Sequence, residues 1–377
     1  MKSGVTPEGL NEQSFFIMLH KNFKNIDKVV FGRGSFDNMA GILAEKRNVN
    51  AGFFLFVVDN YFAGKDLLKR IPAQENDIVR LIDVDPEEPT TELIDALRDE
   101  ILNSKGIPAG VIGIGGGSIM DIAKAISLMF TNEGSSTLYQ GLNLIKKPGI
   151  YHLGVPTISG TGAEVSMTAV LTGPEKKLGL KCDWTVFNQV ILDPELIASV
   201  PTDKWLFTGM DTYIHCIESE NGTLNNAYSH AFAEQSLKLC REIYLGDNAG
   251  QTKENDDKLM VASMMGGLSL TYSEVGVCHA LSYGLSKILH EKHCYANCLA
   301  FQHLEDYYPE GVKELKQMLV QHKVVLPQGL SKNWGDETIT AMAQVAYNLP
   351  HMWNHAIGAD WKEKVTLDTI KDLYRRL

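Results

Sequence analysis

The sequence predicts an N-terminal α/β domain with a parallel sheet, followed by a C-terminal domain built of helices. Two observations lead to this fold class. Apolar, strand-like runs without polar alternation alternate with helical segments in the first half, as in a parallel sheet covered on both faces. Beyond about residue 195, apolar residues recur at helical spacing. The 377 residues suffice for two domains, which we place at residues 1–194 and 195–377.

The elements of the first half follow from local patterns taken in order. KVVFG at residues 28–32 is a short apolar run that ends in a turn, and AGFFLFVV at 51–58 is a continuous apolar run of strand length. A helix is expected directly after Pro89, and GVIGI at 110–114 is typical of a buried strand. The predicted strands are 28–32, 51–58, 78–84 and 110–114, and the predicted helices are 35–45, 90–104 and 118–129.

The second half contains six segments with helical periodicity, and neither an internal repeat nor a low-complexity tract. They cover residues 203–222, 226–244, 255–273, 277–291, 310–323 and 335–348.

Composition excludes several classes of function. The chain carries 35 basic and 46 acidic residues, a net charge of −11, which argues against binding nucleic acid or an anionic membrane. No apolar run approaches the roughly 20 residues that span a bilayer. The N-terminus lacks the pattern of a secretory signal, and the six cysteines form no CxxC pair. We therefore expect a protein of the reducing cytoplasm.

A glycine-rich segment after the predicted strand 110–114 is a candidate phosphate site. Gly115, Gly116, Gly117 and Ser118 join this strand to a helix, and the backbone N–H groups at a helix start can bind a phosphate. The spacing differs from GxGxxG, so a tight turn without a ligand is an equally good interpretation of this segment alone.

Two other features favour a dinucleotide at this turn. Asp59 closes an earlier buried strand, where a carboxylate can accept from a ribose hydroxyl, although a single aspartate there is more often a strand-end cap. The segment 155–164 supplies a second loop rich in hydroxyls and glycine. Because Asp59 would repel a 2′-phosphate, NAD is favoured over NADP.

A second group of residues has metal-binding chemistry. Asp211 and His215 are four apart and share a helix face, and His279 lies in a second helical stretch with His290 and His293. One carboxylate with several imidazoles suits Fe²⁺ or Zn²⁺ with an open coordination position. Helical periodicity aligns His290 with His279 better than His293, and geometry alone does not choose between them. A histidine taken singly is usually an ordinary core or surface residue.

Five blocks together resemble the iron-containing (group III) alcohol dehydrogenase family. GGGSIMD, PTISGTGAEVS, DPEL, GMDTYIHCIE and GVCHALSYGL…HCYAN occur in the family's order over roughly residues 25–300. The resemblance implies a dinucleotide-binding α/β domain, a helical domain and a site in the cleft between them. It implies the metal ligands Asp211, His215, His279 and His293, with HCYAN matching the family's His-Gly-x-Ala-Asn block. The implied cofactor residues are Asp59, Gly115, Gly116, Gly117, Ser118, Asp121, Thr157, Ser159, Thr161 and, on a looser alignment, Lys177.

The sequence departs from the family pattern at two positions. Many members carry a histidine, often assigned to proton transfer, four residues after the first ligand of the later block, and here that residue is Tyr283. A tyrosine can relay a proton too, which makes Tyr283 the candidate catalytic residue. The usual glycine of the His-Gly-x-Ala-Asn block is Cys294, more typical of a small buried residue than of a ligand.

At a finer level, FKNIDKVVFGRGSF and the segment 351–361 resemble one subfamily. It oxidises C8 of the sugar acid 3-deoxy-D-manno-octulosonate (Kdo) ahead of an aminotransferase, on the route to 8-amino-Kdo in bacterial lipopolysaccharide. That subfamily is described as an oxidase, which implies oxygen as the final acceptor, whereas the residues here imply a nicotinamide site. A sugar acid needs a cationic partner, for which Arg33, Lys181 and Lys287 are available.

The sequence thus predicts a metal-dependent oxidoreductase that converts a primary alcohol to an aldehyde, working as a homodimer by family analogy. Three alternatives stay open: a generic alcohol or polyol dehydrogenase, a sugar-phosphate dehydrogenase or dehydroquinate synthase-like lyase on the same scaffold, and a non-catalytic nucleotide- or metal-binding sensor.

Overall fold

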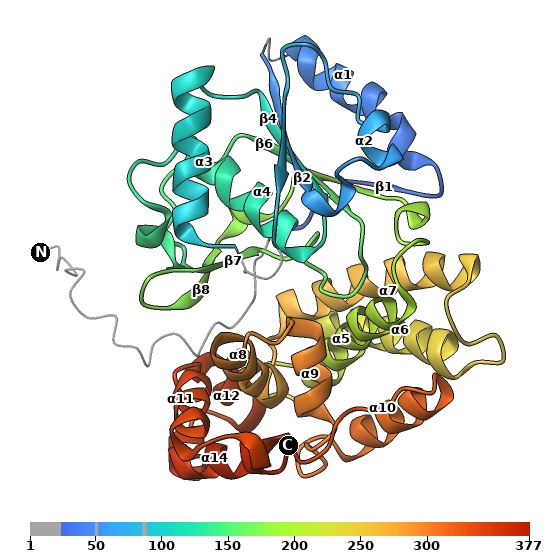
Figure 1. Ribbon diagram of the computed structural model, residues 1–377, viewed down its shortest axis with the longest axis vertical. Coiled ribbons are helices and arrows are strands. Elements are labelled where there is room, and N and C mark those ends of the chain that lie inside the picture. Colours follow the sequence, from blue (N-terminus) through green and yellow to red (C-terminus); the bar gives the residue numbers. More distant parts are fainter. Residues whose placement is uncertain (1–23, 50–51, 85–88) are drawn as a thin grey trace, which may run out of the picture.

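The computed structural model describes residues 24–49, 52–84 and 89–377. Its N-terminal part is a six-stranded, wholly parallel sheet in the order β1-β9-β6-β4-β2-β3 (Figure 1). The segment 1–23, on which the prediction of no secretory signal rests, lies outside the described residues. The strands are β1 (Lys28–Phe31), β2 (Phe54–Asp59), β3 (Ile78–Ile82), β4 (Gly110–Gly115), β6 (Tyr151–Pro156) and β9 (Gln189–Leu192).

Helices cover both faces of this sheet, as the continuous apolar strands predict. In β2, Phe54 and Phe56 belong to one apolar core, and Leu55 and Val57 belong to the other. The first core is completed by α1 (Met39–Val49) and α2 (Asp66–Arg70), and the second by α3 (Thr91–Ser104) and α4 (Gly117–Met129). Successive strand residues point to opposite faces, so a strand buried on both sides must be apolar throughout.

The strand order reverses between β2 and β4. From β2, the chain adds β3 on one side and then β4, β6 and β9 on the other. The carboxyl ends of β2 and β4 are Asp59 and Gly115, so both lie at the point of reversal. In open parallel sheets, ligands bind in the crevice outside the strand ends at such a point.

A small second sheet in the order β5-β8-β7 was not predicted from the sequence. It consists of β5 (Gly141–Leu142), β7 (Thr168–Thr172) and β8 (Lys177–Lys181), with β7 and β8 antiparallel. Figure 1 shows β8 next to the helical domain, above α8 (Val277–Leu289). This hairpin therefore brings side chains of the α/β domain to the boundary between the domains.

After β9, the described chain contains helices and no further strand. The longer ones are α5 (Thr202–Glu220), α6 (Ala227–Leu245), α7 (Lys253–Tyr272), α8, α9 (His293–Phe301), α10 (Pro309–Gln321) and α11 (Asp336–Tyr347). The C-terminus adds α12 (Pro350–Ile357), α13 (Trp361–Lys364) and α14 (Leu367–Arg375). Among the described helices, none combines the length and apolar character needed to cross a membrane.

The structure corrects one part of the helical prediction. The sequence analysis places His279, His290 and His293 in one helical stretch, but α8 ends at Leu289 and α9 begins at His293. His290 caps α8 in the left-handed conformation, with φ 58°. Helical periodicity therefore does not extend from His279 to either His290 or His293, and the ranking of these two by periodicity fails for that reason.

Candidate active site

Four side chains with metal-binding chemistry converge where three helices meet. Asp211 and His215 lie one turn apart on α5, His279 lies in the first turn of α8, and His293 is the first residue of α9. One ligand atom from each lies within 4.8 Å of the other three. His290, the alternative from periodicity, is exposed. The structure thus brings together the four residues that the family resemblance implied.

The distances fit a single divalent ion. Asp211 Oδ1 lies 3.6 Å from Nε2 of both His215 and His279, and Asp211 Oδ2 lies 3.9 Å from His293 Nε2. Ligand atoms that lie about 2.1 Å from a shared ion are about 3.4 Å apart at tetrahedral angles, so the separations in the cluster are close to those that a shared ion requires. These observations fit a resident divalent metal.

The electrostatics of the cluster also favour a cation. Burial works to raise the pKa of Asp211, but the three imidazoles hold that pKa well below its usual range. Burial lowers the pKa of His215 to about 4, against the attraction of Asp211. For His279, Glu218 and Asp211 outweigh burial and raise the pKa to about 9. The cluster therefore attracts positive charge to the space between these side chains.

A carboxylate that the sequence analysis did not single out orients His279, one of the four candidate metal ligands. Glu218 is buried on α5, one turn after His215, and accepts a hydrogen bond from Nδ1 of His279. Its other oxygen accepts from the Cys278 backbone N–H at 2.6 Å and from the Tyr308 hydroxyl at 3.2 Å. A partner on Nδ1 fixes the tautomer that leaves the Nε2 lone pair for a metal. The signal in the sequence was the spacing 211, 215, 218, which places all three on one helix face.

The group Glu218, Cys278 and His279 is also compact, yet it does not form a second metal site. Glu218 and His279 are joined directly by a hydrogen bond, and the Cys278 thiol donates to the Asn297 carbonyl at 3.3 Å. These atoms are therefore already satisfied by one another, and the group supports the first cluster.

Two residues of α9 contact the ligand atoms of the cluster. The Asn297 amide nitrogen lies 2.5 Å from Asp211 Oδ1, 3.1 Å from His279 Nε2 and 3.3 Å from His293 Nε2. The Cys294 thiol, at the position of the usual glycine, donates to Asp211 Oδ2 at 3.3 Å. Both residues hold the Asp211 carboxylate in place. Burial first, and then Asp211, raise the pKa of the Cys294 thiol, which agrees with a small buried residue.

Tyr283 lies beside the cluster, one turn after His279 on α8. Its ring centroid is 5.8 Å from that of His293, and Lys177 Nζ lies 4.7 Å from the Tyr283 ring centroid. The His293 side chain keeps 28% of its surface exposed, whereas those of Asp211, His215 and His279 are at most 5% exposed. The cluster is therefore accessible from the side of His293, where Tyr283 and Lys177 lie.

The glycine-rich turn has the form of a cradle for a phosphate. Gly116 precedes the first residue of α4 and has no side chain, so it does not cap the first N–H groups of this helix. A Cβ on Gly116 would lie 3.2 Å from Ile158, and one on Gly117 would lie 3.1 Å from the Thr161 hydroxyl. The turn and the loop 157–162 therefore approach each other closely at these two glycines.

The remaining predicted cofactor residues surround this turn. Thr157 and Ser159 are buried in the loop after β6, and the Thr157 N–H donates to the Gly115 carbonyl at 2.9 Å. The Asp59 carboxylate accepts from the Tyr61 N–H at 2.9 Å, so it is a cap, and its Cβ lies close to Gly115. Ser118 and Asp121 lie in the first two turns of α4. Lys177 stands apart from them, on β8 over Tyr283.

The cofactor loop is bonded to the helix that carries the metal ligands. The Thr212 hydroxyl donates to the Gly160 carbonyl at 2.8 Å, and the Gly160 N–H donates to the Ser263 hydroxyl at 2.8 Å. A Cβ on Gly160 would overlap the Thr208 carbonyl. Because Thr212 directly follows Asp211, the two candidate sites share one rigid contact across the domain boundary.

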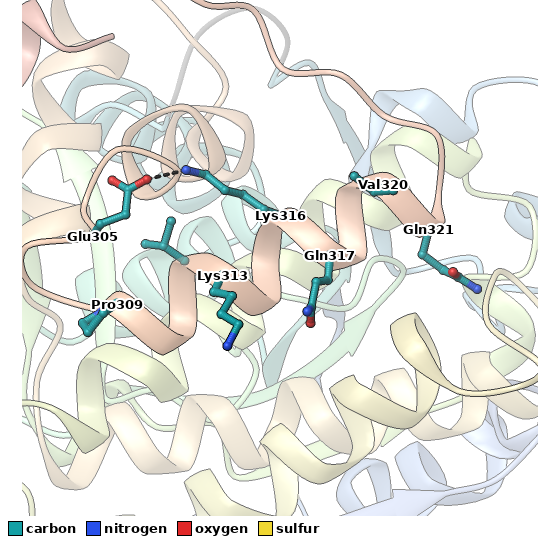
Figure 2. Close-up of a pocket in the computed structure, with 8 residues that line it drawn as sticks. Glu305, Pro309, Lys313, Lys316, Gln317, Val320 and Gln321 are labelled. Atoms are coloured by element: carbon teal, nitrogen blue, oxygen red, sulfur yellow. Dashed lines mark hydrogen bonds and ion pairs between the residues drawn. The ribbon is translucent and has the colours of Figure 1, made fainter.

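A surface hollow elsewhere on the molecule is not a second candidate active site. It occupies about 500 Å³ along the outer face of α10, and Figure 2 shows Glu305, Lys313, Lys316 and Val320 among its lining, with Glu305 paired to Lys316. Its lining contains no histidine or cysteine and no glycine-rich turn. It therefore has none of the chemistry gathered between the two domains.

Fold and site together define a metal- and nicotinamide-dependent oxidoreductase that acts on alcohols. The model of the iron-containing alcohol dehydrogenase family matches residues 27–194, and that of the family's C-terminal domain matches residues 206–352. The chain belongs to the iron-containing alcohol dehydrogenase family. Members of this family use a divalent metal and NAD(H).

Three relatives illustrate the similarity. Sulfoacetaldehyde reductase of Bilophila wadsworthia is 32% identical over 55% of this chain and 54% of that enzyme. Alcohol dehydrogenase 4 of Saccharomyces cerevisiae is 27% identical over 83% of this chain and 81% of that enzyme. The crystal structure of sulfoacetaldehyde reductase from Bifidobacterium kashiwanohense, in complex with NAD⁺, has a TM-score of 0.76 at 21% identity, covering 94% of this chain and 97% of that one.

Proposed function

We propose that this enzyme oxidises a primary alcohol to an aldehyde, with Asp211, His215, His279 and His293 as its metal ligands and NAD⁺ as hydride acceptor. The observation that carries the proposal is the contact between Thr212 and Gly160, which joins the ligand cluster to the loop of the dinucleotide turn. Iron and zinc both suit one carboxylate with three imidazoles.

When bound, the metal lowers the pKa of the substrate hydroxyl and the nicotinamide accepts the hydride. Glu218 and Asn297 keep the ligand atoms aimed at one point. The N–H groups of the turn at Gly115, Gly116, Gly117 and Ser118 hold the pyrophosphate. Asp59, Asp121, Thr157, Ser159, Thr161 and Lys177 contact the rest of the dinucleotide, Lys177 through the ribose.

Tyr283 is the proposed proton relay. It occupies the open side of the cluster beside His293, and the Lys177 ammonium over its ring favours the negative charge that a phenol acquires on giving up its proton. The hydroxyl would pass the proton of the substrate alcohol toward solvent.

For the substrate, we propose C8 of 3-deoxy-D-manno-octulosonate, with an aminotransferase consuming the aldehyde on the way to 8-amino-Kdo. The support is the subfamily resemblance of the opening segment and of residues 351–361. A relative named for sulfoacetaldehyde agrees with a substrate that carries an anionic group. The alternative is a generic alcohol dehydrogenase, favoured by the relatives named for methanol and 1-propanol.

We also propose a homodimer. The edge strand β1 pairs only with β9 in the described sheet, and its Val29 and Phe31 side chains are 42% and 52% exposed. An exposed apolar edge strand is a site where a second copy can add. Sedimentation of the purified protein distinguishes a dimer from a monomer.

The decisive experiment follows absorbance at 340 nm after mixing metal-loaded enzyme with NAD⁺ and Kdo, with butanol and propanediol alongside. A rise with Kdo alone supports the full proposal, and a rise only with the small alcohols leaves the generic dehydrogenase. Binding of NAD⁺ without turnover of any alcohol would instead indicate a sensor, unless oxygen uptake reveals oxygen as the acceptor.

A further inference from the structure

Two lysines of β8 lie across the first half of α8. Lys177 and Lys181 are four residues apart on a strand, so they share one face and lie about 13 Å apart. Lys177 reaches the ring of Tyr283, and Lys181 Nζ lies 3.4 Å from Glu274 Oε2, just before α8 begins. His279 lies between Glu274 and Tyr283 in the chain, so Lys181 and Lys177 contact residues that flank this metal ligand in the sequence.

The surroundings of Lys181 form a polar group at the domain boundary. Burial raises the pKa of Glu274, but Lys181 and then His351 outweigh burial and bring it to about 2, so Glu274 is ionised. Burial lowers the pKa of the neighbouring His351. An ammonium has three N–H donors, and Glu274 uses one of them. The Lys181 side chain is 35% exposed, so further N–H donors can reach a ligand.

The other cations considered for an acidic substrate are placed differently. Arg33 pairs with Asp257 at 2.9 Å and also donates to the Lys253 carbonyl, so its guanidinium joins the two domains. Lys287 is exposed in the last turn of α8, beyond Tyr283. Of the three, only Lys181 lies just before the start of α8, paired with the half-buried Glu274 of the helical domain.

We propose that Lys181, held by Glu274, forms the subsite for an anionic group at the end of the substrate remote from the reacting alcohol. The substrate class is a hydroxy acid, with a primary alcohol at one end and a carboxylate at the other. Glu274 holds the Lys181 ammonium across the domain boundary. This proposal rests on the proposed function and adds to it the residue that selects the substrate.

The test compares substrates that differ only in the anionic group. With metal-loaded enzyme and NAD⁺, kcat/KM is measured for 6-hydroxyhexanoate and for 1,6-hexanediol. The wild type should prefer the acid, and Lys181→Met should lose about 10- to 100-fold on the acid while the diol changes little, as expected for a lost hydrogen bond to a charged group. Lys181→Arg should restore part of the preference.

The matched control is Lys176→Met, which removes an exposed lysine of the same hairpin whose ammonium donates to the Gln140 carbonyl. It should leave both substrates unchanged. Equal kcat/KM for acid and diol in the wild type, or an equal loss on both in Lys181→Met, would overturn the subsite and leave the dehydrogenase standing.

A second measurement separates the subsite from the proposed function. Calorimetry with 6-hydroxyhexanoate in the absence of NAD⁺ needs no turnover. Binding to the wild type that Lys181→Met abolishes supports the subsite even if no alcohol is oxidised. Equal binding to both proteins rejects it.

Discussion

Glu218 and His279 are joined by a buried hydrogen bond in which the carboxylate accepts from Nδ1, while Nε2 of the same ring faces Asp211. The two residues lie on different helices, α5 and α8. The contact therefore sets the direction of a metal ligand and joins two helices of the domain.

Replacing Glu218 with glutamine should weaken metal binding by about 10- to 100-fold, the usual cost of losing a partner of a metal-bound histidine. Competition with a chelator measures the affinity directly. The control is Glu220→Gln, which changes a carboxylate two residues along α5 that pairs with the exposed His230. Unchanged affinity in Glu218→Gln would show that His279 needs no such partner.

The choice between His293 and His290 can be tested with paired alanine variants. His293→Ala should abolish turnover and reduce the bound metal, because His293 Nε2 faces Asp211. His290→Ala should retain both, because His290 is exposed at the end of α8. Elemental analysis of bound metal distinguishes the two variants. Loss of metal in His290→Ala but not in His293→Ala would show that His293 is not a ligand.

Gly117→Val should weaken NAD⁺ binding at least about tenfold, because the added carbons meet Thr161 and fill the cradle at the start of α4. Calorimetric titration with NAD⁺ measures the loss. Gly41→Ala is the control, since a Cβ at Gly41 meets no atom within 4 Å. If Gly117→Val bound NAD⁺ normally, the pyrophosphate would lie elsewhere.

Tyr283→Phe keeps the ring beside His293 and removes only the hydroxyl. If this hydroxyl relays the proton, kcat should fall about 10- to 100-fold while metal and NAD⁺ affinities stay the same. Tyr295→Phe, on a ring that packs against Phe207, serves as the control. An unchanged kcat would assign the proton to another route.

Glu274 should make stability depend on acid pH. Its pKa is lowered from 4.5 to about 2 in the folded protein, so its contribution is complete above pH 4.5 and is lost as the pH falls toward 2. The shift corresponds to at most about 3 kcal/mol. Urea unfolding of wild type and Glu274→Gln should differ most near neutral pH and converge near pH 2, whereas Glu310→Gln, at an exposed pair, should match the wild type throughout.

The sequence predicted the uniformly buried strands β2 and β4 and also the partly exposed edge strands β1 and β3. β2 and β4 are apolar at nearly every position because both sheet faces are covered, and such a run can be recognised from the sequence alone. Among the strands that the sequence did not predict, β9 is only four residues long, and β6 and β8 have mixed composition. β6 contains His152, Gly154 and Pro156, and β8 carries a lysine at each end. Their strand conformation depends on neighbours in the sheet, which periodicity does not report.

The site residues also divide into those that local spacing predicts and those that depend on the tertiary structure. Asp211 and His215 could be paired from spacing, since both lie on one helix. His293 could not be chosen over His290 by periodicity, because the helix breaks at His290 and a new one begins at His293. Glu218 lay within the recognised block, but its role depends on a partner 61 positions away along the chain.

The hydrogen bond between Gly160 and Thr212 limits how freely the two halves of this enzyme can be exchanged. It spans the domain boundary that we place between residues 194 and 195. The loop 157–162 lies on one side, and Thr212, the neighbour of Asp211, lies on the other. A chimera that joined this α/β domain to the helical domain of another family member would carry both the dinucleotide turn and the metal ligands. Its hydride donor and acceptor would nevertheless be misaligned, because the spacing between them belongs to neither half alone.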